Sequence, residues 1–186
     1  IAYELDNLCL NGNTAGATGT YLDILNGILL QITTNSFDAT GLTFDKTVAQ
    51  KTLRKLPGKY YDLEEDYRYY VSHRSRLDYI DSLAAIAVDS AFQQYLTGKQ
   101  DPAYNGTPVR KVPALTTFDT GSGVLGSNGV LINPKNIVFG IHRDITWEMQ
   151  RQRRKRVIEI TATMRIDFKI EQEDAAVKIA KIKHST

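Results

Sequence analysis

The chain has 186 residues, of which 42% are hydrophobic, and its 23 basic residues nearly balance its 21 acidic ones to give a net charge of +2. These proportions are ordinary for a globular domain and exclude a global electrostatic attraction to nucleic acid or membranes. The single cysteine, Cys9, excludes an intramolecular disulfide and a cysteine metal site. No apolar run approaches the roughly 20 residues that span a bilayer.

The chain begins at Ile1 without an initiator methionine. It also lacks the basic start and apolar middle of a signal peptide. We therefore expect a fragment of a longer protein, with further sequence upstream of Ile1.

The first third predicts loops and two helices. Residues 3–10 are mixed in character, and residues 11–19 are rich in Gly, Asn, Thr and Ala, which is typical of a loop. Leucines at helical spacing predict a helix from Thr20 to Leu30. Asp45 is a suitable N-cap for a second helix, which we expect to end at Pro57-Gly58.

The middle of the chain predicts a strand, a long helix and further strands. Tyr69 to Val71 is typical of a strand, and a 3.6-residue apolar period predicts a helix over 76–97 with Ser75 as its N-cap. The prolines flanking residues 109–115 predict an edge or irregular strand there. Strands are also expected at 130–132 and 137–141, on either side of a turn.

The last third has a different pattern. From Ile158 to Ile170 every even position is apolar and every odd position is polar. This alternation predicts one strand of roughly 40 Å, with one face buried and one face in water. Ile145, Trp147 and Met149 alternate likewise, which predicts a long antiparallel ribbon that suits an arm laid against neighbours better than a compact enzyme core.

The turn at 151–156 between these two stretches is the sharpest charge feature, because it gathers four arginines and a lysine. Such a cluster attracts phosphates without reading a base sequence, which would make it a nucleic-acid contact. It is equally typical of a solvated turn or of one half of an intersubunit salt-bridge network. We favour the structural or intersubunit role and keep DNA contact as the alternative, and the two roles do not exclude each other.

Four other sequence patterns do not indicate a catalytic, phosphate-binding or metal-binding site. The glycines at 12, 16 and 19 lack the Gly-Lys-Ser/Thr of a phosphate loop. Ser72 next to His73 suggests a small hydrolase, yet a polar junction before a helix explains the pair more simply. The acidic run 62–66 does not follow a calcium-loop pattern, and the three histidines lie far apart. We therefore predict no catalytic residue, cofactor or metal.

Several segments resemble a known family. Residues 104–115 (YNGTPVRKVPAL), 131–145 (LINPKNIVFGIHRDI) and 165–179 (RIDFKIEQEDAAVKI) resemble, in order, three regions of tailed-phage major capsid proteins. Residues 53–60 (LRKLPGKY) are similar to a helix end that precedes the axial lobe in that family. The resemblance spans residues 53–182 and depends on the order of loose matches.

The resemblance implies the α+β HK97-type capsid fold. A peripheral-type lobe of helices and long antiparallel strands would comprise residues 1–70 and 142–186, and an axial-type lobe, a mixed sheet with helices, would comprise 71–141. The implied role is that of a phage or prophage shell subunit, made in the bacterial host cytoplasm and assembled into virion capsids through hexamers and pentamers. Scaffolding proteins, portal proteins and packaged DNA are implied partners, and no membrane is. The expected intersubunit residues are Arg151, Arg153, Arg154 and Arg156, with Glu64 and Glu65 as acidic counterparts.

Overall fold

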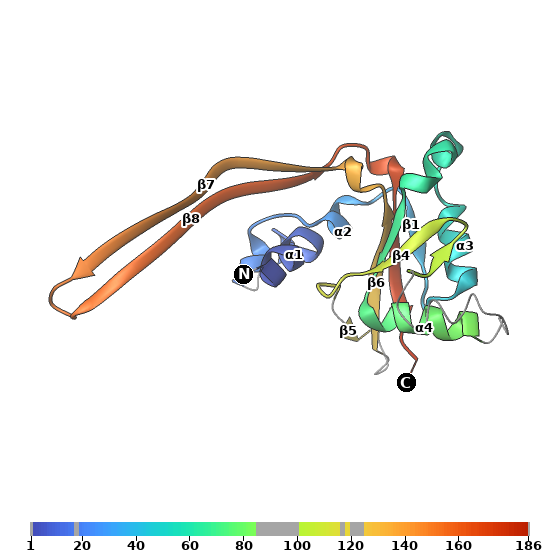
Figure 1. Ribbon diagram of the computed structural model, residues 1–186, viewed down its shortest axis with the longest axis horizontal. Coiled ribbons are helices and arrows are strands. Elements are labelled where there is room, and N and C mark those ends of the chain that lie inside the picture. Colours follow the sequence, from blue (N-terminus) through green and yellow to red (C-terminus); the bar gives the residue numbers. More distant parts are fainter. Residues whose placement is uncertain (1, 17–18, 85–100, 116–117, 120–124, 186) are drawn as a thin grey trace.

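The computed structural model describes residues 2–16, 19–84, 101–115, 118–119 and 125–185. A body of one mixed sheet with helices on both sides carries a long two-stranded ribbon that extends away from it (Figure 1). The helices are α1 (Ala2–Asn11), α2 (Ile28–Gln31), α3 (Lys46–Leu53) and α4 (His73–Ala84), with 3-10 turns η1 (Tyr21–Asp23), η2 (Gly58–Asp66), η3 (Pro134–Asn136) and η4 (Glu173–Ala175). The strands are β1 (Ser36–Asp38), β2 (Arg68–Val71), β3 (Ala103–Tyr104), β4 (Thr107–Lys111), β5 (Phe118–Asp119), β6 (Leu125–Ile132), β7 (Ile137–Gln152), β8 (Val157–Ile170) and β9 (Ala176–Lys183).

The body sheet has the strand order β1-β9-β6-β2-β4-β3, with β5 paired to β6. Strand β9 is parallel to β1 and antiparallel to β6, while β2 is antiparallel to β6 and parallel to β4. The two longest body strands, β6 and β9, therefore lie side by side at its centre. Both lead into the ribbon, since β7 follows β6 and β8 precedes β9.

One face of the body sheet packs against α3, α4 and η2. Alternate residues of each strand point to this face, among them Tyr69, Leu131 and Ile179, all fully buried. The aromatic rings of Phe44 and Tyr69 meet edge-on at 5.9 Å. The Tyr69 hydroxyl donates a hydrogen bond to the Ala49 carbonyl at 2.9 Å, so this buried polar group is satisfied.

The opposite face of the sheet packs against α1 and α2. Val130 and Ile132 of β6 alternate with Leu131 and point to this side, where they meet Ile28 and Leu29 of α2. Two separate apolar clusters thus cover the two faces of one sheet. The cluster on the α1 side also includes residues at the start of β7 and the end of β8, which attaches the ribbon to the body.

Strand β9 contains a bulge that changes which of its side chains point to the core. Ile179 and Ile182 both face α3 and α4, although one position is odd and the other even. The pairing with β6 shifts by one residue between Ser127 and Gly129, and Lys181 adopts a φ of 56°. The extra residue turns Ile182 back to the core, as β-bulges commonly do.

Helix α3 begins as the sequence predicts. The Asp45 carboxylate accepts a hydrogen bond from the Val48 amide at 2.8 Å, which satisfies one of the amides left without a partner in the first turn. The helix ends at Leu53, before the predicted stop at Pro57.

Replacing Asp45 by Ala is expected to lower the free energy of unfolding by about 1 kcal/mol, the usual loss for an N-cap. Urea denaturation followed by circular dichroism measures this, with Asp45→Asn as the matched control because asparagine also caps well. Equal losses of unfolding free energy in both variants would show that the loss does not come from the capping hydrogen bond.

Three helix predictions differ from the structure. Residues 3–10 form α1 and not a mixed segment, and the helix predicted from Thr20 to Leu30 is replaced by η1 and the short α2. Gly27, extended at φ −68° and ψ 164°, separates them. The third prediction, Ser75 as N-cap, is wrong because α4 already begins at His73. Ser72 precedes the helix instead, and its hydroxyl accepts a hydrogen bond from the Ser75 backbone amide at 3.2 Å.

The strands predicted at 69–71 and 130–132 are present within β2 and β6. The strand predicted at 109–115 is only partly present, because β4 ends at Lys111 and residues 112–115 are not in a strand. Strand β4 lies next to the sheet edge, with only the two-residue β3 outside it. Residues 85–97 of the predicted long helix lie outside the described residues. No helix in the described part of the chain is long and apolar enough to cross a bilayer.

The division into two lobes stays a prediction. Strand β9, from the range expected in the peripheral-type lobe, pairs with β6, from the range expected in the axial-type lobe. The body sheet therefore draws strands from both ranges.

Candidate assembly interface

The ribbon consists of β7 and β8, paired from Ile137 with Ile170 to Gln152 with Val157. The predicted long antiparallel ribbon is thus confirmed. Its register shifts by one residue twice, between Ile141 and Arg143 and again before Thr146. Because the side-chain period is two, these two shifts together restore the original face.

The ribbon therefore has one continuous apolar face. Directly opposite residues of an antiparallel pair point to the same side, and the pairs on this side join apolar residues over most of the ribbon. They are Ile137 with Ile170, Phe139 with Phe168, Ile141 with Ile166, Trp147 with Ala162 and Met149 with Ile160. The opposite face is polar, with pairs such as Glu148 with Thr161.

This apolar face is open to solvent, and the prediction that it would be buried is wrong for the isolated chain. Trp147 is 66% exposed, Met149 78% and Ile160 59%. Only near the body is the face covered, where Phe168 is buried and its ring lies 5.0 Å from that of Phe139. The reason is architectural, since a two-stranded ribbon has no second layer of its own.

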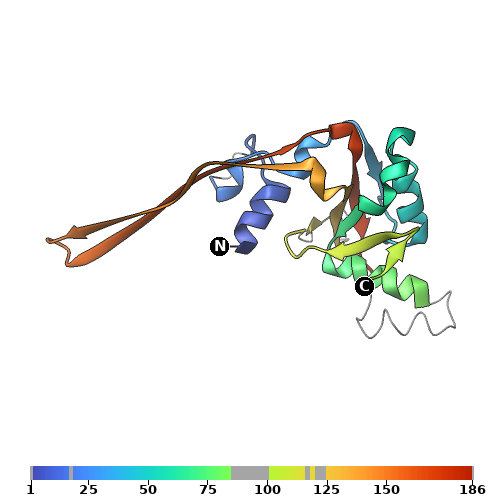
Figure 2. The same ribbon diagram turned by 45° about the horizontal axis from the view of Figure 1, so that its top comes forward.

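The basic cluster, defined as Arg151, Arg153, Arg154, Lys155 and Arg156, lies at the free end of the ribbon, farthest from the body (Figures 1 and 2). All five side chains are exposed, and Arg156 closes the turn with a φ of 53°. Arg151 shares the apolar face with its partner Ile158. Together with Arg153, Arg156 and Val157 they line a hollow of about 580 Å³.

The predicted acidic counterparts are placed only by their backbone. Glu64 and Glu65 belong to η2 in the body, and their side chains lie outside the described part. Their neighbour Asp66 forms an ion pair with Lys135 at 3.0 Å. The pairing of Glu64 and Glu65 with the basic cluster therefore stays a prediction.

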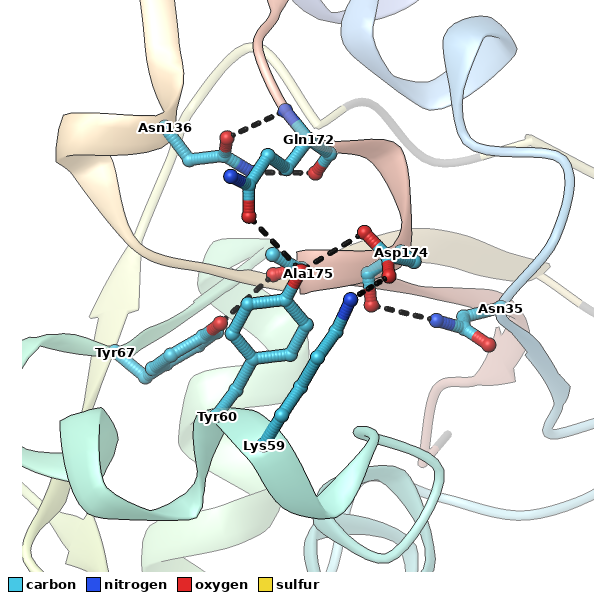
Figure 3. Close-up of polar contacts among 8 residues, drawn as sticks. All are labelled: Asn35, Lys59, Tyr60, Tyr67, Asn136, Gln172, Asp174 and Ala175. Atoms are coloured by element: carbon cyan, nitrogen blue, oxygen red, sulfur yellow. Dashed lines mark hydrogen bonds and ion pairs between the residues drawn. The ribbon is translucent and has the colours of Figure 1, made fainter.

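The ribbon base, the junction formed by Asn136 and residues 171–174, is fixed by polar contacts (Figure 3). The side chain of Asn136 forms two hydrogen bonds with the backbone of Gln172. Its amide nitrogen Nδ2 donates to the Gln172 carbonyl at 2.7 Å, and its oxygen Oδ1 accepts from the Gln172 backbone amide at 2.8 Å. This pair ties the start of β7 to the end of β8. The two ends of the ribbon cannot separate without breaking both bonds.

Residues of η2 hold the same junction from the side. Lys59 Nζ forms an ion pair with Asp174 Oδ2 at 2.5 Å, and the Tyr60 hydroxyl lies 2.9 Å from both Asp174 Oδ1 and Gln172 Oε1. The Lys59 bond, followed by the Tyr60 bond, lowers the pKa of Asp174. The Asn35 amide completes the junction by donating to the Asp174 carbonyl at 2.8 Å.

A third set of contacts comes from the last residue of α2 and from the loop after it. The Glu173 carboxylate accepts four hydrogen bonds of 2.6 to 3.0 Å, from the amides and hydroxyls of Thr33 and Thr34. Gln31 bonds reciprocally with β8, donating to the Phe168 carbonyl at 3.0 Å and accepting from the Ile170 amide at 3.2 Å. The ribbon is thus anchored from three directions, which fixes its orientation on the body.

The hydrogen bonds from Thr33, followed by those from Thr34, lower the pKa of Glu173 to about 2. A carboxylate with a depressed pKa stabilises the fold above its unfolded pKa and loses that contribution as pH falls through the folded value. Stability should therefore decline between about pH 4.5 and pH 2 in part through Glu173. Denaturation midpoints of the unmodified chain and Glu173→Gln should converge towards pH 2, and parallel pH profiles would contradict this.

The Ser72-His73 pair does not form a nucleophile and base. The Ser72 hydroxyl is buried and contacts the Ser75 and Ser127 hydroxyls at 3.0 and 2.9 Å, whereas His73 is exposed on the first turn of α4. Among the described residues no cluster of His, Cys, Asp or Glu side chains could hold a metal ion.

The ribbon base depends on residues that the sequence did not indicate. Lys59 and Tyr60 lie more than a hundred residues from Asp174, and no local pattern connects them. The one available signal was the polar run from Glu171 to Asp174, which interrupts two apolar strands and marks a junction.

Comparisons with known proteins agree on one architecture. No family model matches the chain. The chain is 30% identical to the Bacillus subtilis (strain 168) protein YqbE, named "Putative prophage capsid protein", over 98% of this chain and 58% of that protein. It therefore spans less than two thirds of the length of this curated relative.

Solved structures share the fold at low sequence identity. A satellite phage P4 procapsid that includes the size determination protein matches 98% of this chain and 60% of that chain, with a TM-score of 0.67 and 12% identity. The SrpI encapsulin of Synechococcus elongatus PCC 7942 matches 86% of this chain and 59% of that chain, with a TM-score of 0.61 and 9% identity. The capsid of an empty GTA particle gives 0.59 over 98% of this chain and 62% of that chain, at 11% identity.

The chain therefore has the α+β HK97-type capsid fold, and its resemblance to the capsid proteins of phages and prophages is confirmed.

Proposed function

We propose that this chain is a structural subunit that assembles with copies of itself, through hexamers and pentamers, into the icosahedral head shell of a tailed phage or prophage around packaged DNA. The observation that carries the proposal is the long ribbon with an open apolar face on an HK97-type fold. Monomeric proteins rarely expose a continuous apolar patch of this kind. On this proposal the chain acts through its surfaces and catalyses no reaction.

The location and partners that we propose for the subunit follow from its resemblance to capsid proteins. The shell would be the protein's final location, after synthesis in the bacterial host cytoplasm. Scaffolding and portal proteins would meet it during assembly, and DNA would contact it without sequence preference. Residues 1–70 with 142–186 would form the peripheral-type lobe and residues 71–141 the axial-type lobe.

The basic cluster would serve contacts between subunits, made by Arg151, Arg153, Arg154 and Arg156. Its position supports this, because an exposed charged turn at the end of a long arm reaches beyond its own body. The alternative is a nucleic-acid-binding module using residues 151–156. That alternative predicts DNA binding by the chain that weakens steeply with added salt.

Electron microscopy and light scattering of the complete translated protein that contains this chain test the proposal. Closed shells or capsomer rings are the expected result. A protein that stays monomeric, with or without its scaffolding protein, and binds DNA in a salt-dependent manner would favour the alternative. Reversal of charge at Arg154 should weaken assembly, and unchanged assembly would remove the intersubunit role of that residue.

A further inference from the structure

The end of β9 carries a histidine side chain that is enclosed by the body. His184 lies two residues beyond Ile182, and because side chains alternate along an extended chain, both point to the side of the sheet that α4 covers. His184 is only 2% exposed. A side chain that ordinarily changes its charge near neutral pH is therefore buried at this end of the sheet.

The imidazole ring of His184 makes no hydrogen bond to the described residues. Neither Nδ1 nor Nε2 has a partner in the part of the chain that the structure describes. A neutral imidazole has one N–H donor and one acceptor nitrogen, whereas a protonated ring has two donors and a positive charge. Protonation would therefore add a buried charge to a ring that already lacks hydrogen bonds, which burial strongly disfavours.

The charged groups of α4 near His184 do not offset this burial. Burial lowers the pKa of His184 below its usual 6.5 and is the largest influence on it. The Asp78 carboxylate and the Gly126 backbone act in the opposite direction, whereas Arg74 adds to the lowering. The neutral ring is therefore the form that fits the folded body.

The other strands around His184 contribute little charge. The part of β6 beside it begins with Leu125 and Gly126, which carry no charge. Strand β5 pairs with this part of β6 and carries Asp119, which is placed only by its backbone. Lys183 precedes His184 on the chain, and alternation directs its side chain to the other side of the sheet.

Residues 183–185, which we call the β9 end segment, are attached to α4 and β6 by polar contacts. The His184 amide donates to the Leu125 carbonyl at 3.0 Å. The Ser185 amide donates to the Asp78 carboxylate at 3.3 Å, and the Ser185 hydroxyl donates to the same carboxylate. Within the segment only His184 is buried, so the fit of its ring decides whether the segment stays attached.

The surface beneath the β9 end segment is held together without it. The hydroxyls of Ser72, Ser75 and Ser127 meet at 2.9 to 3.1 Å and join the first turn of α4 to β6. Ile182, which directly precedes the segment, is fully buried in the core. The segment can therefore detach while α4, β6 and the rest of β9 keep their places.

We propose that the β9 end segment is a pH-dependent conformational switch, which lies against α4 and β6 while His184 is neutral and detaches when the ring takes up a proton. Detachment brings the charged ring into water, releases the Asp78 carboxylate from Ser185 and uncovers the start of β6. The inference goes beyond the proposed function, because it concerns a change within one chain and holds whether or not copies assemble.

The direction of the pH dependence follows from the two states of the ring. Its pKa is lower in the attached segment than in the detached one, so the detached form binds more protons. Attachment is therefore complete above about pH 6.5 and weakens as the pH falls through the lowered pKa of the attached form. Each pH unit within this window multiplies the detached fraction by at most about ten. The window begins above the range in which Glu173 loses its contribution, so the two effects are separable.

Hydrogen exchange of the full chain, resolved by residue with NMR and corrected for the intrinsic exchange rate at each pH, tests the proposal. The Lys183 and His184 amides both donate to backbone carbonyls, and their protection should fall several-fold between pH 7.5 and pH 5.5. The Lys178 amide, bonded deeper in the sheet, should keep its protection. The variants His184→Gln and His184→Phe remove the titrating group with a polar and an apolar side chain, and both should abolish the pH dependence.

His73→Gln is the matched control, because His73 is exposed on the first turn of the helix that covers His184. This variant should keep the full pH dependence, and its loss there would overturn the proposal. Persistence in both His184 variants would overturn it as well, and disappearance in Asp78→Asn would then assign the titration to that carboxylate.

An NMR titration of the His184 ring in the unmodified chain gives a second readout that needs no variant to fold. A midpoint below 6.5 is expected, because the attached segment favours the neutral ring. A midpoint at or above 6.5, or protection of the Lys183 and His184 amides that does not change with pH, would overturn the proposal. Shell formation by the complete translated protein is decided separately, since neither measurement depends on assembly.

Discussion

Replacing both Trp147 and Met149 by aspartate is expected to abolish shells and capsomers. These side chains are 66% and 78% exposed in the isolated chain, on the apolar face of the ribbon. Two carboxylates there would have to be buried unpaired in any interface that covers this face, at several kcal/mol each. Electron microscopy and sedimentation velocity of the variant should show dispersed subunits.

The fold itself should remain intact. Substitutions at exposed positions usually change the free energy of unfolding by less than about 0.5 kcal/mol, so the urea midpoint should hardly move. This separation of assembly from stability distinguishes an interface residue from a core residue. A large loss of stability would mean that the ribbon face packs within its own chain.

A matched control lies on the other face of the same ribbon. Thr161 and Thr163 pair with Glu148 and Thr146 on the polar side, so Thr161→Asp with Thr163→Asp adds the same two charges at a similar distance along the ribbon. Assembly should survive in this control. Loss of assembly in both variants would point to net charge, and normal assembly in both would exclude the apolar face as an interface.

The sequence predicted those elements whose signals are local. The Asp45 cap, the β2 strand and the alternating ribbon each depend on side chains within a few residues of one another. The ribbon was the clearest, because an alternation from Ile158 to Ile170 has no helical explanation. The alternation of apolar and polar residues identified an apolar face of the ribbon but not the surface that covers this face.

Other features depend on contacts that no local pattern contains. The leucines before residue 30 have helical spacing, yet Gly27 adopts an extended conformation that lets its backbone meet the end of α1. Helix α1 was missed because its polar residues mask an apolar side that packs on the sheet. The ribbon base joins η2 to the chain beyond residue 170, and only the folded structure brings these groups together.

Replacing Gly27 by Ala is expected to displace α1 and to lower the free energy of unfolding by on the order of 3 kcal/mol. A Cβ atom at this position would lie 2.5 Å from the Leu10 carbonyl oxygen and 2.6 Å from the Gly12 amide nitrogen. Both are backbone atoms, so no side-chain rotation relieves the overlap. The hydrogen bond from the Gly27 amide to the Gly12 carbonyl at 2.8 Å would be lost as the chains move apart.

Gly58 provides the matched control, because a Cβ atom there meets nothing within 4 Å. Gly58→Ala should change the urea midpoint little or raise it slightly, since alanine reduces the entropy of the unfolded chain. Hydrogen exchange should show residues 2–11 losing protection in Gly27→Ala alone. Equal stability of the two variants would contradict the close backbone approach at Gly27.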